Sequence, residues 1–281
     1  MAPLSERIAL HTWTLDKTPL PELLDVARDA GFNGIELRFK DFQRCAEAGL
    51  DNDKVLEMVR ASGLKVSVIG TEYGVIFAVG EERLRLLGSL EQTCRNAVAL
   101  GCDTVMVAPG LNPPTTLEHA AESLRLCGEV AARYNIRFAL EFNSRHALIN
   151  RLAVGRELVA MANHPNCGLL LDAYHLHCGG AIGRSFAEMP VEQIFTFQYS
   201  DAPAHPMQVR TATDRLPPGA GVIPWVDVFE LLIEKRYPGF IAYEAPNPAQ
   251  WSRPPLEVAR EAVVATRRFI RQAEQRIAGT P

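Results

Sequence analysis

The sequence predicts an α/β protein that folds as a single (β/α)₈ TIM barrel, and three observations carry this prediction. Short apolar runs recur eight times along the chain. Each run is reached through a segment with helical periodicity and a turn that contains glycine or asparagine. No linker or low-complexity tract divides residues 1–281, so we expect one domain over the whole length.

The eight apolar runs are rich in β-branched residues and fit the strands of a parallel sheet. They span residues 8–13, 34–38, 65–70, 104–109, 137–142, 167–172, 194–201 and 239–245. Helical stretches between them, such as residues 20–29, 84–100 and 117–134, repeat apolar residues at intervals of three and four. Strands alternating with such helices indicate a parallel sheet that is buried on both faces. Eight units of roughly 30 residues fit a closed barrel.

An open, doubly wound sheet is the alternative α/β architecture. Such a sheet usually carries a glycine-rich phosphate loop after its first strand. Here the first strand continues into HTWTLDKT, which contains no G-x-G-x-x-G motif. The closed barrel is therefore favoured.

Composition and charge exclude several classes of protein. The 281 residues are 47% hydrophobic and 22% charged, which argues against disorder. The 29 basic and 33 acidic residues leave a net charge of -4, without the positive field that holds nucleic acid. No apolar run approaches the roughly 18 residues that span a membrane, and the N-terminus does not resemble a secretory signal. We expect a cytoplasmic protein without nucleic-acid or membrane partners.

Polar side chains close the last four predicted strands. In (β/α)₈ barrels the working residues stand at the C-terminal ends of the strands, where the loops form the pocket. These ends carry Glu141, Asp172, Gln198 and Glu244. Burying three carboxylates together is prohibitive unless a cation compensates their charge. Carboxylate and amide oxygens suit Mg²⁺ or Mn²⁺, with Co²⁺ or Zn²⁺ as alternatives. We therefore expect a divalent metal site.

The motifs LEFN, LDAYH, QYSDAP, RLPPGAG and AYEA resemble those of the xylose isomerase-like TIM-barrel superfamily, and the resemblance runs over nearly the whole chain. This superfamily contains sugar isomerases and epimerases, inosose and 3-dehydroshikimate dehydratases and, more distantly, endonuclease IV. The resemblance implies that His175 and Arg215 contact the substrate. It also implies a set of metal ligands, namely Glu141, Asp172, Gln198 and Glu244.

The resemblance implies a metal-dependent isomerase or epimerase that acts on a sugar- or polyol-derived ketone through a metal-stabilised enediolate. In the epimerase relatives two metal-bound glutamates act as acid and base, and Glu141 and Glu244 inherit these roles beside His175. If the intermediate instead expels a β-hydroxyl, the same site becomes a dehydratase of a cyclic keto-acid or inosose, such as 3-dehydroshikimate or 2-keto-myo-inositol. His175 or His146 would then be base or acid, and Arg215 would position a carboxylate or hydroxyl.

Two departures from the superfamily narrow the range of substrates. Many isomerases and epimerases of the superfamily have histidine at the position of Gln198, whereas the segment FQYSDAP with its glutamine is similar to that of the dehydratase branch. Ketose 3-epimerases hold the sugar's terminal hydroxyls with a further glutamate, but the loop of residues 143–150 reads NSRHALIN. A strict ketohexose 3-epimerase is therefore disfavoured. His11 and Trp13 end the first strand and are expected to wall the pocket, with Trp13 stacking on the substrate.

Two other classes of protein are alternatives to a sugar-processing enzyme. An endonuclease IV-like nuclease needs histidines at the ends of the third and fourth strands for a three-zinc cluster, and Thr71, Glu72 and residues 108–110 offer none. A barrel without catalytic activity is the second class. We expect a small-molecule substrate, namely a sugar, a polyol or a cyclic keto-acid. The sequence does not determine the oligomeric state, although superfamily relatives often pair through their barrel faces, which makes a homo-oligomer an option.

Overall fold

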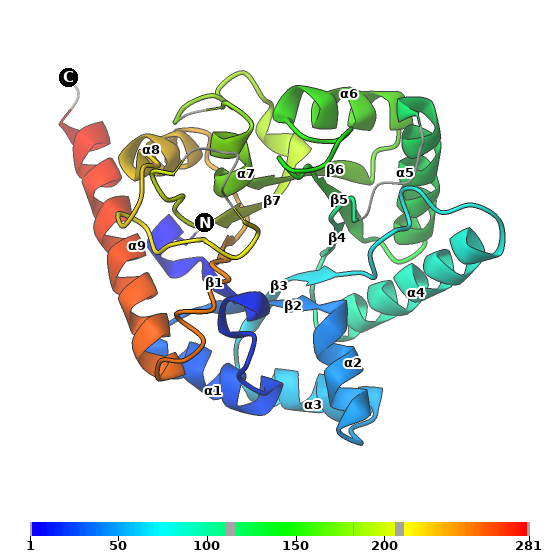
Figure 1. Ribbon diagram of the computed structural model, residues 1–281, viewed down its shortest axis with the longest axis horizontal. Coiled ribbons are helices and arrows are strands. Elements are labelled where there is room, and N and C mark those ends of the chain that lie inside the picture. Colours follow the sequence, from blue (N-terminus) through cyan, green and yellow to red (C-terminus); the bar gives the residue numbers. More distant parts are fainter. Residues whose placement is uncertain (1, 111–115, 182, 206–210, 280–281) are drawn as a thin grey trace.

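The computed structural model describes residues 2–110, 116–181, 183–205 and 211–279, and its strands close into a barrel (Figure 1). Eight strands follow one another around the barrel in sequence order, each parallel to its neighbours. The first strand pairs with the eighth and completes the ring. The predicted (β/α)₈ barrel is confirmed.

The strands are short and the helices vary in length. The strands are β1 (Ile8–His11), β2 (Gly34–Arg38), β3 (Lys65–Gly70), β4 (Thr104–Val107), β5 (Arg137–Glu141), β6 (Cys167–Asp172), β7 (Ile194–Tyr199) and β8 (Ile241–Tyr243). The helices are α1 (Leu20–Ala30), α2 (Phe39–Glu47), α3 (Asn52–Ala61), α4 (Gly80–Ala99), α5 (Leu117–Ala132), α6 (Leu152–Ala162), α7 (Ala173–Cys178), α8 (Trp225–Glu234) and α9 (Pro255–Ala278).

Every strand lies within the apolar run that predicted it. Strand β8 is shortened most, to Ile241–Tyr243 within the run 239–245, and β1 ends at His11 although its apolar run continues to Trp13. The chain turns there into a short 3₁₀ helix, Thr12–Leu15, because the Trp13 N–H donates to Nδ1 of His11 at 3.1 Å. Helix α1 ends at Gly31, whose φ of 94° is the left-handed conformation that glycine adopts without strain. The chain then enters β2 within three residues.

Helix α9 completes the outer layer of helices. Figure 1 shows it running along one side of the barrel, where it packs on α8 and on α1. Its buried face includes Val258, Ala262 and Ile270. This contact joins the two ends of the chain's helical layer, as β1 and β8 join the two ends of the sheet. Across the described ranges, no helix is both long and apolar enough to cross a membrane.

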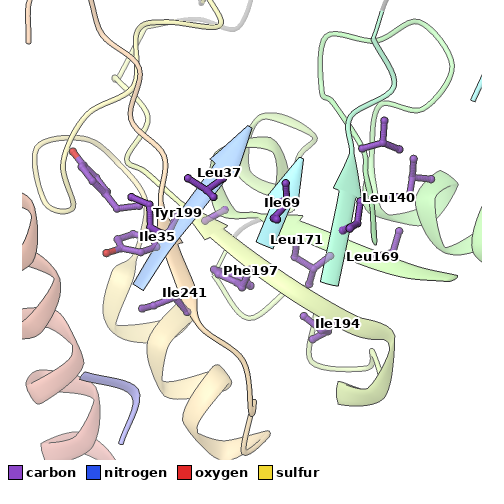
Figure 2. Packing of buried hydrophobic residues seen from close by; sticks show 14 of the residues in the cluster. Ile35, Leu37, Ile69, Leu140, Leu169, Leu171, Ile194, Phe197, Tyr199 and Ile241 are labelled. Carbon is purple, nitrogen blue, oxygen red and sulfur yellow. The ribbon is translucent and has the colours of Figure 1, made fainter. Parts of the chain in front are cut away.

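Alternation along the strands divides the core into two layers. Figure 2 shows Ile35 and Leu37 of β2 and Phe197 of β7 in the large buried cluster. Successive side chains of a strand point to opposite faces, so this cluster lies between the sheet and the helices. A second, smaller cluster takes alternate positions and fills the barrel interior: Val68, Met106, Ala139, Leu170 and Phe195. The same alternation directs Glu36 and Gln198 into the interior.

A buried aspartate organises the long connection between β7 and α8. The Asp201 carboxylate accepts hydrogen bonds from the backbone N–H groups of Ala202, Gly219 and Ile223 and from the Trp225 indole, all at 2.8–2.9 Å. The Asp201 backbone also exchanges two hydrogen bonds with Leu216, at 2.7 and 3.0 Å. These bonds fix the segment that carries residue 215 against the end of the sheet.

We predict that Asp201→Ala destabilises the protein by about 3–5 kcal/mol, because it leaves several buried donors without an acceptor. Urea unfolding followed by circular dichroism measures this loss. Asp25→Ala is the control, since Asp25 forms an exposed ion pair with Arg28 and its loss changes the stability by less than about 0.5 kcal/mol. Equal stabilities for the two variants would contradict the prediction.

Candidate active site

A cavity of about 500 Å³ opens where the barrel strands end. Its floor is formed by residues of five of the strands and the residue after β8: His11, Gly70, Met106, Glu141, Gln198 and Glu244. Its wall comes from the end of β2 and from the segments that follow the first three strands: Trp13, Arg38, Lys40 and Tyr73. The cavity therefore places five of the predicted site residues around one space, namely His11, Trp13, Glu141, Gln198 and Glu244.

Three buried carboxylates gather at this floor. Asp172 is fully buried, and Glu141 and Glu244 are each 6% exposed. Burial raises the pKa of Glu141 well above its usual value, and the charges of Glu244 and Asp172 raise it further. Burial also raises the pKa of Glu244, although the guanidinium of Arg215 opposes this effect. The site therefore concentrates negative charge that water does not stabilise.

Arg215 is the internal counter-ion of this site. Its Nη1 donates to Oδ2 of Asp172 at 2.6 Å and to Oε2 of Glu244 at 2.7 Å. Burial alone would lower the pKa of Arg215, but the carboxylates of Asp172 and Glu244 outweigh it and raise this pKa above its usual value. The ring of Tyr174 lies under the guanidinium, with 4.6 Å from Cζ to the ring centroid. Arg215 is thus fixed by charge on one side and by an aromatic face on another.

His175 lies beside Arg215 as a neutral imidazole. Nη2 of Arg215 donates toward Nε2 of His175 at 3.1 Å. On the other side of the ring, Nδ1 accepts from the Ser144 backbone N–H at 3.3 Å and lies 2.9 Å from the Ser144 hydroxyl. Burial lowers the pKa of His175 to about 4. Nε2 also lies near two carboxylates, 3.6 Å from Oε1 of Glu141 and 3.9 Å from Oδ2 of Asp172.

His11 is a second buried imidazole of this site. Its Nδ1 accepts from the Trp13 N–H, so the proton of the neutral ring is on Nε2, 3.5 Å from Oε1 of Glu244. Burial, with the charges of Arg38 and Arg215, lowers the pKa of His11 well below its usual value. His11 therefore presents an N–H to Glu244. Trp13, half-buried, follows it on the cavity wall.

Glu36 is a buried site residue that the sequence analysis missed. It lies on β2, is fully buried, and its Oε1 accepts from Nε2 of Gln198 at 2.7 Å. Burial and the charge of Glu244 raise the pKa of Glu36, to about 8, although the hydrogen bond from Gln198 lowers it. The available signal was an acidic residue at the centre of the apolar run GIELR. The predicted site residues all follow or close a strand, whereas Glu36 lies inside one.

His146 lies outside the cavity lining. Its ring stacks on Phe77, with 5.2 Å between centroids and 4° between planes. Its Nδ1 accepts from the backbone N–H groups of Leu148 and Ile149, at 3.1 and 2.9 Å. These contacts show that His146 shapes the loop of residues 143–150.

Three of the buried groups can hold a metal ion together. Ligand atoms of Glu141, Asp172 and His175 all lie within 4.8 Å of one another. Gln198 and Glu244 line the adjacent cavity floor and add an amide and a carboxylate oxygen. Such a set of oxygen and nitrogen donors at the mouth of a (β/α)₈ barrel defines a class of barrel enzymes that position a cation against a small substrate.

The family follows from the sequence itself. Residues 24–269 match the family model described as xylose isomerase-like TIM barrel, so this chain belongs to that family. The resemblance and its barrel fold are thereby confirmed.

Individual relatives are similar over most of this chain. An inosose isomerase of Halalkalibacterium halodurans is 23% identical over 89% of this chain and 90% of that protein. A 3-dehydroshikimate dehydratase of Pseudomonas aeruginosa is 28% identical over 81% of this chain, but the match spans only 36% of that protein's length. A solved structure described as the IOLI protein with a binding zinc atom aligns with a TM-score of 0.80 at 19% identity, over 96% of this chain and 98% of that one. The named relatives are enzymes, and the solved structure shares the fold.

We predict that Arg215→Met costs about 3–5 kcal/mol of stability at pH 8, because it leaves Asp172 and Glu244 buried without their counter-ion. The loss is smaller at pH 5. Without the guanidinium the pKa of Glu244 rises further, so the folded protein binds more protons than the unfolded chain and its stability falls as the pH rises.

Urea unfolding of metal-free protein at pH 5 and pH 8 measures this difference. Arg253→Met is the matched control, because Arg253 pairs with Glu261 on the surface and its loss has little effect at either pH. A cost for Arg215→Met that does not change with pH would contradict the assigned charge balance.

Proposed function

We propose that this chain is a divalent-metal-dependent isomerase or epimerase of a sugar- or polyol-derived ketone. The observation that carries the proposal is the pair of buried glutamates, Glu141 and Glu244, that line one cavity. They stand at strand ends on either side of Asp172 and Gln198. Two carboxyl groups beside one small substrate can act as the general base that removes a proton from carbon and the general acid that returns one.

The proposed metal ligands are Glu141, Asp172, Gln198 and Glu244. Oε1 of Gln198 is buried and, within the described part of the chain, accepts no hydrogen bond, which suits coordination of a cation. Oxygen donors favour Mg²⁺ or Mn²⁺, whereas the nitrogen of His175 beside Glu141 and Asp172 suits Co²⁺ or Zn²⁺. When bound, the ion polarises the substrate carbonyl and acidifies the neighbouring C–H.

In the proposed reaction Glu141 and Glu244 exchange the roles of base and acid. One takes the proton from the carbon next to the carbonyl, and the other delivers a proton to the planar intermediate. His11 supports this exchange, since its Nε2–H lies near Glu244 and can stabilise the carboxylate form. Arg215 holds the second oxygen of Glu244 and so keeps this side chain in place.

We expect Glu141→Gln and Glu244→Gln each to lower kcat by about a thousandfold, because an amide cannot take the proton. Glu72→Gln is the control, since Glu72 lines the same cavity but pairs with Arg85. Turnover of ketoses, inososes and 3-dehydroshikimate is measured with Mn²⁺, Mg²⁺ and Co²⁺, and circular dichroism checks that each variant is folded. A fully active double variant would exclude both glutamates as acid and base.

A dehydratase of a cyclic keto-acid or inosose is the second candidate. The specific observation in its favour is the contact between Arg215 and His175, which places a neutral base beside a fixed cation. In this reaction His175 takes the proton next to the carbonyl, the resulting imidazolium gives a proton to the β-hydroxyl, which leaves as water, and Arg215 orients the substrate. The named dehydratase relative of Pseudomonas aeruginosa supports the same choice.

Deuterated solvent separates the two candidates. For the isomerase or epimerase we expect deuterium in recovered substrate and product, detected by mass spectrometry, without loss of water. For the dehydratase we expect a conjugated product that absorbs in the ultraviolet. Protein stripped of metal by a chelator is the blank in both assays. Absence of both signals over the whole substrate and metal screen would favour a barrel without catalytic activity.

A further inference from the structure

We infer that Glu36 is a positioning residue that orients the amide of Gln198, so that the carbonyl oxygen of this side chain is presented to the metal. This inference rests on the proposed metal site, in which Gln198 is a ligand. Glu36 belongs to β2 and Gln198 to β7, and 162 residues separate them in the chain. Their hydrogen bond crosses the interior of the barrel.

The direction of this hydrogen bond follows from the chemistry of the two groups. A primary amide donates through its nitrogen and accepts through its oxygen, so at 2.7 Å Nε2 of Gln198 donates and Oε1 of Glu36 accepts. When Glu36 is ionised it can only accept, and the opposite orientation of the amide would then bring two acceptor oxygens together in a buried site. With Nε2 engaged, Oε1 of Gln198 points elsewhere and, among the described residues, has no hydrogen-bond donor.

The fold does not otherwise explain a carboxylate at position 36. Its Oε2 is buried and has no partner in the described ranges. Nε2 of His11 lies 4.0 Å from Oε1, beyond hydrogen-bond distance. The neighbours on either side, Ile35 and Leu37, are apolar and fully buried. A buried carboxylate with one hydrogen bond costs stability, whereas an apolar side chain of the same size would not.

The interaction matches the way that proteins orient metal ligands. A ligand's remaining polar atom is commonly held by a carboxylate behind it, and removing that partner typically weakens metal binding about 10–100-fold. In Gln198 the oxygen Oε1 would coordinate the metal, and the nitrogen Nε2 is held by its hydrogen bond to Glu36. Free rotation of the amide would otherwise present the nitrogen, which is no ligand for a cation, about as often as the oxygen.

The test compares Mn²⁺ binding by calorimetry in wild type, Glu36→Gln and Glu36→Met, with Glu72→Gln as the control. We expect both Glu36 variants to bind Mn²⁺ about 10–100-fold more weakly and Glu72→Gln to stay within about twofold of wild type. Thermal unfolding of the metal-free proteins gives the second readout. We expect an unchanged or higher midpoint for both Glu36 variants, because each removes a buried carboxyl group whose Oε2 has no hydrogen-bond partner among the described residues. A lower midpoint in both would show that Glu36 supports the fold, and would overturn the inference.

A double-mutant cycle separates orientation from charge. In a Gln198→Ala background, Glu36→Met has nothing to orient, so we expect it to change Mn²⁺ affinity by less than about threefold. An equal loss in both backgrounds would mean that Glu36 acts through its own charge, and would overturn the inference. If wild type binds none of Mn²⁺, Mg²⁺, Co²⁺ and Zn²⁺, the proposed metal site itself is wrong. This result differs from one in which wild type and the Glu36 variants bind Mn²⁺ equally well, which contradicts only the role of Glu36.

Discussion

The balance of buried charge at the end of the barrel is the constraint on which the site depends. Asp172, Glu141 and Glu244 project into a space with little solvent, and burial raises the pKa of both glutamates. The guanidinium of Arg215 bonds two of these carboxylates at once. Its segment is in turn fixed by the hydrogen bonds of Asp201. One cation does not neutralise three carboxylates, so a divalent ion is a natural complement to this arrangement.

The regular geometry of a parallel barrel brings these groups together without special loops. Side chains alternate between the helical layer and the interior, and every strand ends at the same rim. A polar residue at an inward position of one strand therefore meets inward side chains of other strands. Glu36 and Gln198 are distant in sequence but meet across the interior for this reason. Hydrogen bonds then add direction, because the amide nitrogen of Gln198 donates to Glu36 and the Trp13 N–H donates to Nδ1 of His11.

The fold was predictable because its signals are local. Each strand is a short apolar run, and all eight lie where the runs predicted them. The acidic ends of β5 and β6 were visible in the same way. Glu36 was missed because its meaning depends on Gln198, whose contact with it exists only after the barrel closes. His146 lies outside the cavity lining, and its contacts with Phe77, Leu148 and Ile149 could not be predicted because they depend on the loop's folded path.

The cavity is asymmetric, and this explains why the chemistry is easier to infer than the substrate. The groups suited to proton transfer and metal binding come from the ends of β5 to β8, whereas the wall that a substrate meets comes from the end of β2 and the segments that follow β1 to β3. That wall mixes the aromatic rings of Trp13 and Tyr73 with the charges of Arg38 and Lys40. Such side chains occur in any surface loop, so no local pattern marks them. Substrate choice can therefore change through this wall while the carboxylate floor, constrained by its charge balance, stays the same.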